Sequence, residues 1–467
     1  MINQYLLDKI RTAFSLEPTS QQSALMEKVA NFIVDKDSDR IFLLKGYAGT
    51  GKTSVISSVI KVMDELQQPV VLLAPTGRAA KVLSIYSEKQ AFTIHKKIYR
   101  QKSGADFNSD FNLNVNLHKS TLFVVDEASM IANSAPDSVF GSGCLLDDLI
   151  HYVYSGENCR LILIGDTAQL PPVGQLLSPA LDKGMLEGYG FSVDEFELTE
   201  VVRQASSSGI LSNATFLRTL IANEFYDDGL PKIDTESFPD VKKMPGDELI
   251  EALSSSYGKY GTDDVIVISR SNKRANVFNN GIRNSVLYRE EELSSGDMLM
   301  VVKNNYFWSK DIKGFDFIAN GDVAEVKRIR NKRELYGFRF AEVLLYFPDY
   351  DTEIEANILL DTLQSPSPTL TYDDSNRLFQ AVQEDYMDIG NKRDRMLKMR
   401  QDPYLNALQV KFAYAVTCHK AQGGQWDDVY IDVGYITEEQ TDIEFLRWLY
   451  TAFTRARRNV YMINWRD

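Results

Sequence analysis

Cysteine and long apolar runs are both scarce in this sequence. The 467 residues include three cysteines and no CxxC pair, which argues against a disulfide framework or a structural zinc site and favours a reducing cytoplasm. No apolar run is long enough to span a bilayer, and the first residues lack the apolar stretch and small-residue cleavage site of a signal peptide. We therefore expect a cytoplasmic protein with no membrane partner.

Basic residues are outnumbered by acidic ones, and the formal net charge is −14. Proteins that bind nucleic acids are usually basic, so a nucleic acid would have to bind this acidic protein through a local basic groove. Low-complexity tracts and internal repeats are absent, and no further carboxylate cluster has metal-ligand spacing, which argues against a nuclease. With 44% apolar and 25% charged residues, the chain fits a soluble globular protein of about two to four domains.

A glycine-rich phosphate-loop motif is the strongest signal that is present. Residues 46–53 read GYAGTGKT, which matches G-x-x-x-x-G-K-[ST], between an apolar run and a helical pattern. The glycines allow backbone N–H groups to form a nest for a β-phosphate at a helix N-terminus. Lys52 adds a charge at the β- and γ-phosphates, and the Thr53 hydroxyl is suited to bind Mg²⁺. The predicted nucleotide-binding residues of this motif are Gly49, Thr50, Gly51, Lys52 and Thr53.

Apolar runs typical of strands alternate with helix-compatible segments along most of the chain. The first set lies at 41–45, 70–74, 121–125 and 160–165, and the second at 265–269, 411–416, 429–433 and 459–464. Continuous apolar strands separated by helices are typical of parallel sheets covered on both faces. The predicted fold class is therefore α/β, with two such units.

Residues 284–410 have a different texture. The segments GDMLMVV, NGDVAEVKRI and GFRFAEVLLYF alternate like strands and are separated by turns, which predicts a small antiparallel β-barrel inserted into the second unit. A charged helical stretch follows. Its run KRDRMLKMR fits a solvated helix face better than a binding site, and both interpretations stay open.

Polar side chains follow apolar strands of the first unit. Asp126 and Glu127 end a buried strand at the edge where open α/β sheets bind ligands, so Asp126 is suited to hold Mg²⁺ and Glu127 to take a proton from attacking water. Gln169, in GDTAQLPPV, is suited to sense a γ-phosphate. Arg203 and Arg455 are candidates for stabilising charge on that phosphate, although each alone also fits a surface salt bridge.

The order of these motifs resembles the superfamily 1 helicases, specifically their RecD-like 5′-to-3′ branch (superfamily 1B). The motifs are GYAGTGKT, APTGRAAK (74–81), TIH (93–95), DEASM (126–130), GDTAQLPPV (165–173), LTEVVRQ (198–204), TCHKAQGGQWDDVY (417–430) and YTAFTRARR (450–458). The resemblance covers nearly the whole chain. It implies an ATP-dependent DNA helicase, acting as a monomer on single-stranded and duplex or forked DNA. It also implies two RecA-like motor domains with ATP and Mg²⁺ in the cleft between them.

The resemblance also divides the chain. It implies a first motor domain at 1–200 with an inserted β-hairpin at 96–119, and a second motor domain made of 201–283 and 411–467. The barrel, SH3-like by analogy, and the helical stretch fill 284–410.

The family's nucleotide contacts are carried over residue by residue. A glutamine ahead of the first strand reads adenine in this family, and both Gln21 and Gln22 are available; we prefer Gln22 because Thr19 lies three residues ahead of it. Gly423 is assigned to the nucleotide site as well. The implied catalytic residues, with the arginines as arginine fingers, are Lys52, Glu127, Gln169, Arg203 and Arg455.

Contacts to the DNA strand are implied by three further motifs. Hydroxyls, amides and helix N-termini position phosphates without reading sequence, which suits these residue types. The alternative interpretation of the histidines is that they are packed residues. The implied DNA-binding residues are Thr76, Arg78, Thr93, His95, Thr417, His419 and Lys420.

The polar segment after His95 corresponds to the duplex-splitting hairpin of the family. Phe107 and Phe111 could stack on bases, a contact worth about 1–3 kcal/mol each, or could anchor the hairpin to the domain. Gln425 stands where relatives often have an acidic residue. A glutamine can still hydrogen-bond a ribose or a backbone phosphate, so we expect this contact to be altered and not lost. A nucleotide-gated binding subunit without processive unwinding, and an RNA substrate, remain alternatives.

Overall fold

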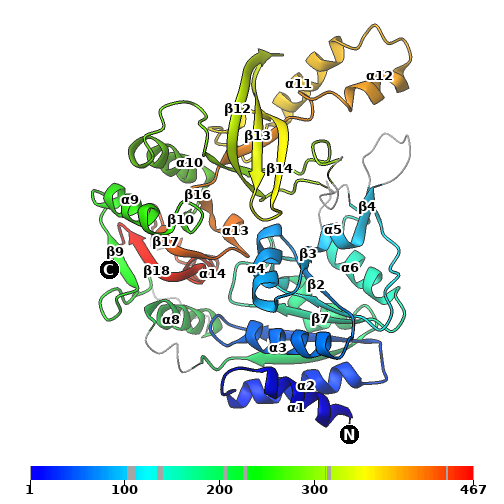
Figure 1. The fold of residues 1–467 in the computed structure, drawn as a ribbon. Coiled ribbons are helices and arrows are strands. Elements are labelled where there is room, and N and C mark those ends of the chain that lie inside the picture. Colours follow the sequence, from blue (N-terminus) through cyan, green and yellow to red (C-terminus); the bar gives the residue numbers. More distant parts are fainter. Residues whose placement is uncertain are drawn as a thin grey trace.

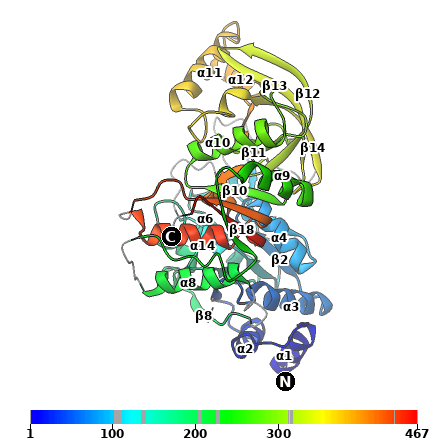
Figure 2. The same ribbon diagram turned by 90° about the vertical axis from the view of Figure 1, so that its left-hand side faces the viewer.

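Two parallel sheets and a closed five-stranded barrel organise the chain (Figure 1). The computed structural model describes residues 2–101, 111–133, 140–202, 208–223, 229–310, 312, 317–437 and 440–465. The two sheets and the barrel confirm the predicted α/β fold class with a barrel in the second half. In both views the barrel and the N-terminal helices lie at opposite ends of the molecule (Figure 1, Figure 2).

The first sheet has the strand order β3-β2-β6-β7-β1-β8, with every pairing parallel. Successive residues of β1 alternate between two cores: Phe42 and Leu44 pack with the N-terminal helices, and Ile41 and Leu43 pack on the other face. The sheet is therefore buried on both sides. Its strands are β1 (Arg40–Gly46), β2 (Val70–Ala74), β3 (Ala91–Thr93), β6 (Leu122–Val125), β7 (Arg160–Gly165) and β8 (Ser192–Leu198).

Helices cover both faces of this sheet (Figure 1). On one face α1 (Ile2–Ala13), α2 (Ser20–Val34) and α3 (Lys52–Glu65) pack together. Thr19 begins α2 with a capping box that satisfies free N–H groups of the first turn. The other elements of this unit are α4 (Gly77–Ser87), α5 (Ile94–Ile98), α6 (Leu145–Tyr154), α7 (Lys183–Glu187) and the 3₁₀ turns η1 (Ala128–Met130) and η2 (Pro179–Leu181).

The second sheet has the order β16-β10-β17-β18-β9 and is also parallel. Its strands are β9 (Val241–Met244), β10 (Val265–Ser269), β16 (Ala415–Thr417), β17 (Trp426–Asp432) and β18 (Ala456–Ile463). The helices of this unit are α8 (Gly209–Asn223), α9 (Leu249–Tyr260), α10 (Asn272–Gly281), with the π turn η4 (Ile282–Val286), α13 (Cys418–Ala421) and α14 (Ile443–Phe453). No helix in the described ranges is long and apolar enough to cross a bilayer.

The barrel lies within the second half of the chain. It consists of β11 (Met298–Val301), β12 (Val323–Leu335), β13 (Phe338–Phe347), β14 (Thr352–Leu359) and β15 (Leu408–Phe412), with η5 (Leu360–Thr362) after β14. Between β14 and β15, α11 (Tyr372–Glu384) and α12 (Lys392–Met399) form the predicted charged helical stretch. In the first unit, β4 (Tyr99–Gln101) pairs with β5 (Phe111–Leu113) as the expected antiparallel hairpin.

One predicted strand was wrong. The apolar run 411–416 does not form a single strand of the second sheet: its first residues belong to β15, which closes the barrel, and β16 begins only at Ala415. Both pieces are buried, so the apolar pattern does not mark the point where the chain changes sheets.

Candidate nucleotide site and nucleic-acid face

The phosphate-loop motif joins a buried strand to a helix. β1 ends at Gly46, α3 begins at Lys52, and Gly49 and Gly51 between them have φ angles of +75° and +81°. Glycine adopts these left-handed angles without steric cost, and at Gly51 an added Cβ would also lie 2.3 Å from Nε2 of Gln22. The glycines therefore permit the tight turn that a phosphate-binding nest requires.

The Lys52 ammonium lies over the loop that precedes it. Its Nζ donates to the carbonyl oxygens of Gly46 at 2.5 Å and Tyr47 at 2.9 Å. The buried Thr50 donates its hydroxyl to the same Tyr47 carbonyl at 2.8 Å. Because neutral carbonyls leave the charge of the lysine uncompensated, it remains suited to bind an anion such as a phosphate.

The two candidate glutamines lie in different surroundings. Gln22 is 2% exposed; its Oε1 accepts from Thr19 N–H at 3.0 Å, and its Nε2 donates to the Thr50 carbonyl at 3.0 Å. Gln21 instead accepts from Thr199 N–H at 2.9 Å. Gln22, and not Gln21, therefore lies against the phosphate loop, and it would have to release one of these bonds to contact adenine.

Two carboxylates directly follow β6. Burial raises the pKa of Asp126 to about 6, and the charge of Glu127 adds to this rise, while Lys52 and Arg455 oppose it. Glu127 has a φ of +54°, a left-handed conformation that is costly for a residue with a side chain and occurs often at functional sites. This strain sets Glu127 apart from an ordinary acidic residue at a strand end.

Arg455 reaches the carboxylates from the second unit. It is 4% exposed, and its Nη1 lies 3.7 Å from Oε1 of Glu127. Within its own unit, its Nε donates to the Thr451 carbonyl at 3.1 Å and its Nη1 to the Gly424 carbonyl at 3.4 Å. The guanidinium is thus fixed in the second unit while it faces the first. Arg203, the other predicted arginine finger, lies outside the described residues.

Gln169 carries an unpaired acceptor. The residue is 6% exposed, and its Oε1 has no hydrogen-bond partner in the described part of the chain. It follows β7, which pairs with the strand that ends before Asp126. A buried oxygen without a donor is expensive in free energy, and an attacking water or a phosphate-bound water would satisfy it.

The donors around the loop fit Mg²⁺ held mainly by a nucleotide. Mg²⁺ is commonly bound through one or two carboxylates together with phosphate oxygens and water. Thr53, in the first turn of α3, has no hydrogen-bond partner for its hydroxyl among the described residues, and Asp126 supplies a carboxylate. Within the same described ranges, no group of three or more His, Cys, Asp or Glu is suited to hold a metal by itself.

Three threonines of the predicted DNA motifs occupy equivalent positions. Thr76, Thr93 and Thr417 each precede a helix as its N-cap, at α4, α5 and α13. The hydroxyls of Thr76 and Thr93 accept from the N–H groups of Ala79 and Lys96, both at 3.2 Å, whereas Thr417 makes no such cap bond. Polar groups at helix starts are suited to contact phosphates.

Arg78 contacts the second unit. Its guanidinium lies 4.2 Å from the ring centroid of Trp426, and its Nη2 donates to the Asp263 carbonyl at 3.4 Å. Arg78 therefore joins the two units in this structure, whereas the resemblance implied a contact to DNA.

His95 and Phe111 belong to an aromatic cluster at the base of the hairpin. The centroids of both rings lie 4.8 Å from that of Phe140, and Phe111 also lies 4.7 Å from Tyr306 of the barrel insertion. Of the two interpretations left open for Phe111, its 5% exposure fits an anchor of the hairpin and leaves little of the ring available to a base. Burial lowers the pKa of His95 to about 4, which makes it neutral at physiological pH. Phe107 lies outside the described residues.

The remaining predicted DNA contacts follow β16. Burial lowers the pKa of Lys420 to about 8, and burial also lowers the pKa of His419. Lys420 therefore stays mainly protonated near neutral pH and is suited to a phosphate, while His419 is suited to act as a neutral hydrogen-bonding group.

The assignment of Gly423 to the nucleotide is not supported. Its φ is +74°, and an added Cβ would lie 2.8 Å from Cβ of Ala79 and 3.2 Å from Oγ1 of Thr76. Gly423 thus packs against the first turn of α4, on the predicted DNA motif, because the second unit approaches the first closely there.

Sequence reasoning missed the side chains that join the two units. One side chain of the second unit hydrogen-bonds to the phosphate loop, that of Tyr450 in α14. Three others hydrogen-bond to the segment after β7: those of Arg447, Thr451 and Gln422. For Gln422, Tyr450 and Thr451 the available signal was that they are polar side chains within the motifs TCHKAQGG and YTAFTRARR; Arg447 lies outside both motifs.

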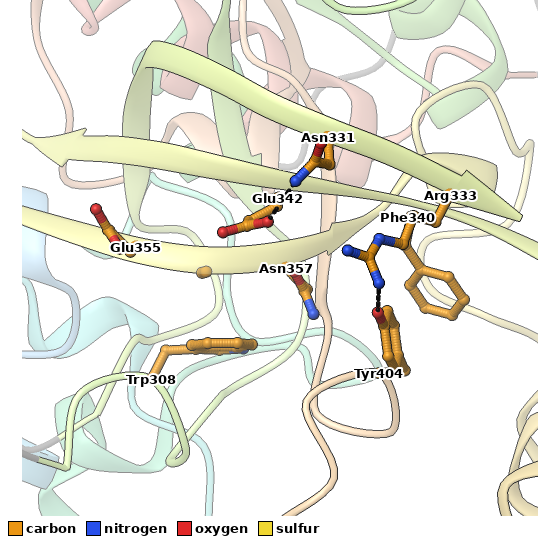
Figure 3. A pocket seen from close by; sticks show the side chains of 9 residues that line it. Trp308, Asn331, Arg333, Phe340, Glu342, Glu355, Asn357 and Tyr404 are labelled. Carbon is orange, nitrogen blue, oxygen red and sulfur yellow. Dashed lines mark hydrogen bonds between the residues drawn. The ribbon is translucent and has the colours of Figure 1, made fainter. Parts of the chain in front are cut away.

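A separate cavity of about 240 Å³ lies on the barrel (Figure 3). Asn357 points toward the space between Trp308 and Tyr404, whose hydroxyl accepts from Arg333 at 3.3 Å. Every lining residue comes from the barrel insertion, and none belongs to the predicted motifs. The cavity is therefore distinct from the nucleotide site.

Two family models match the chain. Residues 18–219 match an AAA domain, and residues 412–463 match a UvrD-like helicase C-terminal domain. The first match includes the phosphate loop, the carboxylate pair and Gln169, and the second includes Lys420 and Arg455.

Curated relatives align over most of the chain at low identity. The ATP-dependent RecD2 DNA helicase of Deinococcus radiodurans is 24% identical over 94% of this chain and 49% of its own length, so the chain spans about half of that relative. The ATP-dependent DNA helicase dda of Enterobacteria phage T4 is 24% identical over 92% of this chain and 95% of its own length.

Solved structures of similar proteins include the Pif1 helicase from Bacteroides in complex with ADP-AlF3 and ssDNA. It is 15% identical, covers 96% of this chain and 92% of that chain, and has a TM-score of 0.46.

Proposed function

Because the chain belongs to the RecD-like branch of the superfamily 1 helicases, we propose that it hydrolyses ATP between its two parallel-sheet units and uses the cycle to move 5′-to-3′ on single-stranded DNA, unwinding duplex DNA ahead of it. The observation that carries the proposal is the approach of Arg455 to Glu127, at 3.7 Å between units. An arginine at this place can stabilise phosphate charge only when the units are together.

The chain's own residues divide the work of hydrolysis. Lys52 and the backbone of the glycine-rich loop bind the phosphates, and Gln22 borders the adenine side of the loop. Glu127 takes the proton of the attacking water, and the unpaired Oε1 of Gln169 orients that water. Mg²⁺, held by Thr53 and Asp126 with the nucleotide, would neutralise phosphate charge. Arg455 completes the site from the second unit, and the family resemblance assigns Arg203 the role of a second arginine finger.

The strand would run over both units. The N-cap threonines of α4, α5 and α13, with Lys420, are suited to hold phosphates and sugars without reading bases. Contacts from both units to one strand support stepwise movement, because opening and closing of the nucleotide site changes their separation. The hairpin β4–β5, fixed to the barrel insertion through Phe111, is suited to meet the duplex.

Steady-state ATP hydrolysis with and without single-stranded DNA tests this function. Wild-type protein should hydrolyse ATP, and single-stranded DNA should accelerate it. Lys52→Ala should abolish hydrolysis and unwinding together, since the phosphate charge would lose its main partner. Lys61→Ala, in the same helix but paired with Glu88 at the surface, is the matched control and should behave as wild type.

The outcome also separates the alternatives. Binding of DNA under ATP control without turnover would identify a nucleotide-gated binding subunit. Equal stimulation by RNA and DNA oligonucleotides would make the substrate assignment wrong. Hydrolysis that persists in Lys52→Ala would contradict the site.

A further inference from the structure

The hydroxyl of Tyr450 connects the two units at the phosphate loop. Tyr450 lies in α14 of the second unit and is 1% exposed. Its Oη accepts from the N–H of Ala48, within the phosphate loop, at 2.9 Å, and donates to Oδ2 of Asp166 at 2.6 Å. Asp166 directly follows β7, is 2% exposed and also accepts from Ala168 N–H at 2.9 Å. One phenol group therefore bridges two strand ends of the first unit.

The segment after β7 is held by neighbouring residues as well. Leu170 N–H donates to Oγ1 of Thr451 at 2.9 Å, and the Leu170 carbonyl accepts from Nε2 of Gln422 at 2.7 Å. Arg447 donates to the carbonyl of Gln169 at 3.3 Å. The backbone around Gln169 is thus clamped by the second unit, while its side-chain Oε1 is left without a partner among the described residues.

The proposed arginine finger lies just beyond the same helix. α14 ends at Phe453, and Arg455 follows two residues later, with its Nη1 3.7 Å from Oε1 of Glu127. Because Nε of Arg455 donates to the Thr451 carbonyl at 3.1 Å, Arg455 is tied to α14, and a contact at Tyr450 constrains its position relative to the phosphate loop. Gln169 and Arg455 are therefore linked to one another through Tyr450.

We infer that Tyr450 is a positioning residue for hydrolysis: its hydroxyl sets Gln169 and Arg455 in register with the phosphate loop when the two units close. This inference rests on the proposed ATP hydrolysis. The hydroxyl of Tyr450 acts through protein groups, because its two hydrogen bonds go to Ala48 and Asp166. Loss of this positioning should weaken the stabilisation of charge in the transition state and change the binding of ATP in the ground state much less.

The chemistry of the hydroxyl suits a permanent bridge. Burial raises the pKa of Tyr450 well above its ordinary value, and the carboxylate of Asp166 adds to this because a phenolate beside it would be repelled. The phenol therefore keeps its proton and always donates to Asp166, which leaves its lone pairs for Ala48 N–H.

Tyr450→Phe tests the inference, because it keeps the buried ring and removes the two hydrogen bonds. Loss of a bond to a charged group predicts that kcat of DNA-stimulated hydrolysis falls about tenfold or more, with KM for ATP within about twofold. Tyr257→Phe is the matched control. Tyr257 is a buried tyrosine of the same unit whose hydroxyl has no partner among the described residues, so its variant should hydrolyse ATP like wild type.

A second variant approaches the same bond from the other end. Asp166→Asn should also lower kcat, and the double variant with Tyr450→Phe should lose clearly less than the sum of the two single losses, since both variants act on the shared bond between Tyr450 and Asp166. If Tyr450→Phe does not fold, Asp166→Asn alone carries the test. An unchanged kcat in whichever variants fold, or additive losses, would overturn the inference. Absence of hydrolysis in wild type would instead overturn the proposed function.

Discussion

At the scale of single residues, the nucleotide site is completed by contacts between the units. Arg455 approaches Glu127 from the second unit, and Tyr450 of α14, in the same unit, accepts a hydrogen bond from Ala48 N–H. Neither unit alone contains the full set of groups that we propose for hydrolysis. The phosphate loop and the carboxylates could be read from the sequence because their spacing is diagnostic. Tyr450 could not, because nothing in a local pattern reveals a hydrogen bond to a residue far along the chain.

His95 and Phe111 show the same limit in another way. Both are ambiguous in the sequence, since a histidine or phenylalanine serves a packed core as well as a nucleic-acid contact. In the fold, Phe140 packs against both rings, and Tyr306, which lies far along the chain, packs against Phe111. Tertiary packing therefore decided what composition left open.

Asp322 gives a prediction for stability against pH. It is 3% exposed and accepts from Ala319 N–H at 2.7 Å and from the Tyr350 hydroxyl at 3.0 Å. Burial raises its pKa from 3.8 to about 7. Its stabilising contribution is complete below the unfolded pKa and is lost as pH rises through the folded one. Between about pH 5 and pH 8, wild type should lose on the order of 1–3 kcal/mol relative to Asp322→Asn.

Denaturant unfolding of both proteins at several pH values measures this difference. Asp64→Asn is a suitable control, because Asp64 is a surface carboxylate paired with Lys89 and its variant should follow the wild-type trend. Parallel pH profiles for wild type and Asp322→Asn would show that Asp322 is not a buried titrating group.

At the scale of elements, position within a sheet determined which strands could be predicted. β2, β7 and β10 were predicted with their observed bounds, since each is continuously apolar and buried. β3, β8 and β9 were not predicted, and all three lie at sheet edges. Edge strands keep polar residues on the open side, as in SVDEFEL and VKKM, and therefore lack a continuous apolar run.

The aromatic cluster predicts a separation of unwinding from hydrolysis. Phe111 fixes the β4–β5 hairpin to Phe140 and to Tyr306 of the barrel insertion. Phe111→Ala removes packing worth about 3–5 kcal/mol and should release the hairpin. Duplex unwinding should then fall about fivefold or more, while DNA-stimulated hydrolysis stays within about twofold.

Strand-displacement and hydrolysis rates, measured on the same preparation, check this separation. Phe111→Leu should retain most unwinding because it keeps apolar bulk at the site. Phe216→Ala, which truncates a 38% exposed ring of α8, should leave both rates unchanged. Unwinding at the wild-type rate in Phe111→Ala would exclude the hairpin from duplex separation.

At the scale of the whole molecule, charge and architecture point to local recognition. The net charge is −14, so the proposed binding of DNA depends on particular groups, for which Lys420 and the N-cap threonines are the candidates. The barrel lies at the opposite end of the molecule from α1 and α2 (Figure 1). The barrel insertion contacts the β4–β5 hairpin of the first unit through Tyr306 and Phe111. This contact joins the barrel insertion directly to the hairpin expected to meet duplex DNA.

Strand displacement on tailed duplexes tests the central claim most directly. With ATP and Mg²⁺, wild-type protein should separate a duplex that carries a 5′ single-stranded tail and leave one with only a 3′ tail intact. Displacement of the 3′-tailed duplex alone would reverse the proposed direction. Failure to displace either duplex, while ATP is hydrolysed, would contradict the account of a motor that unwinds DNA.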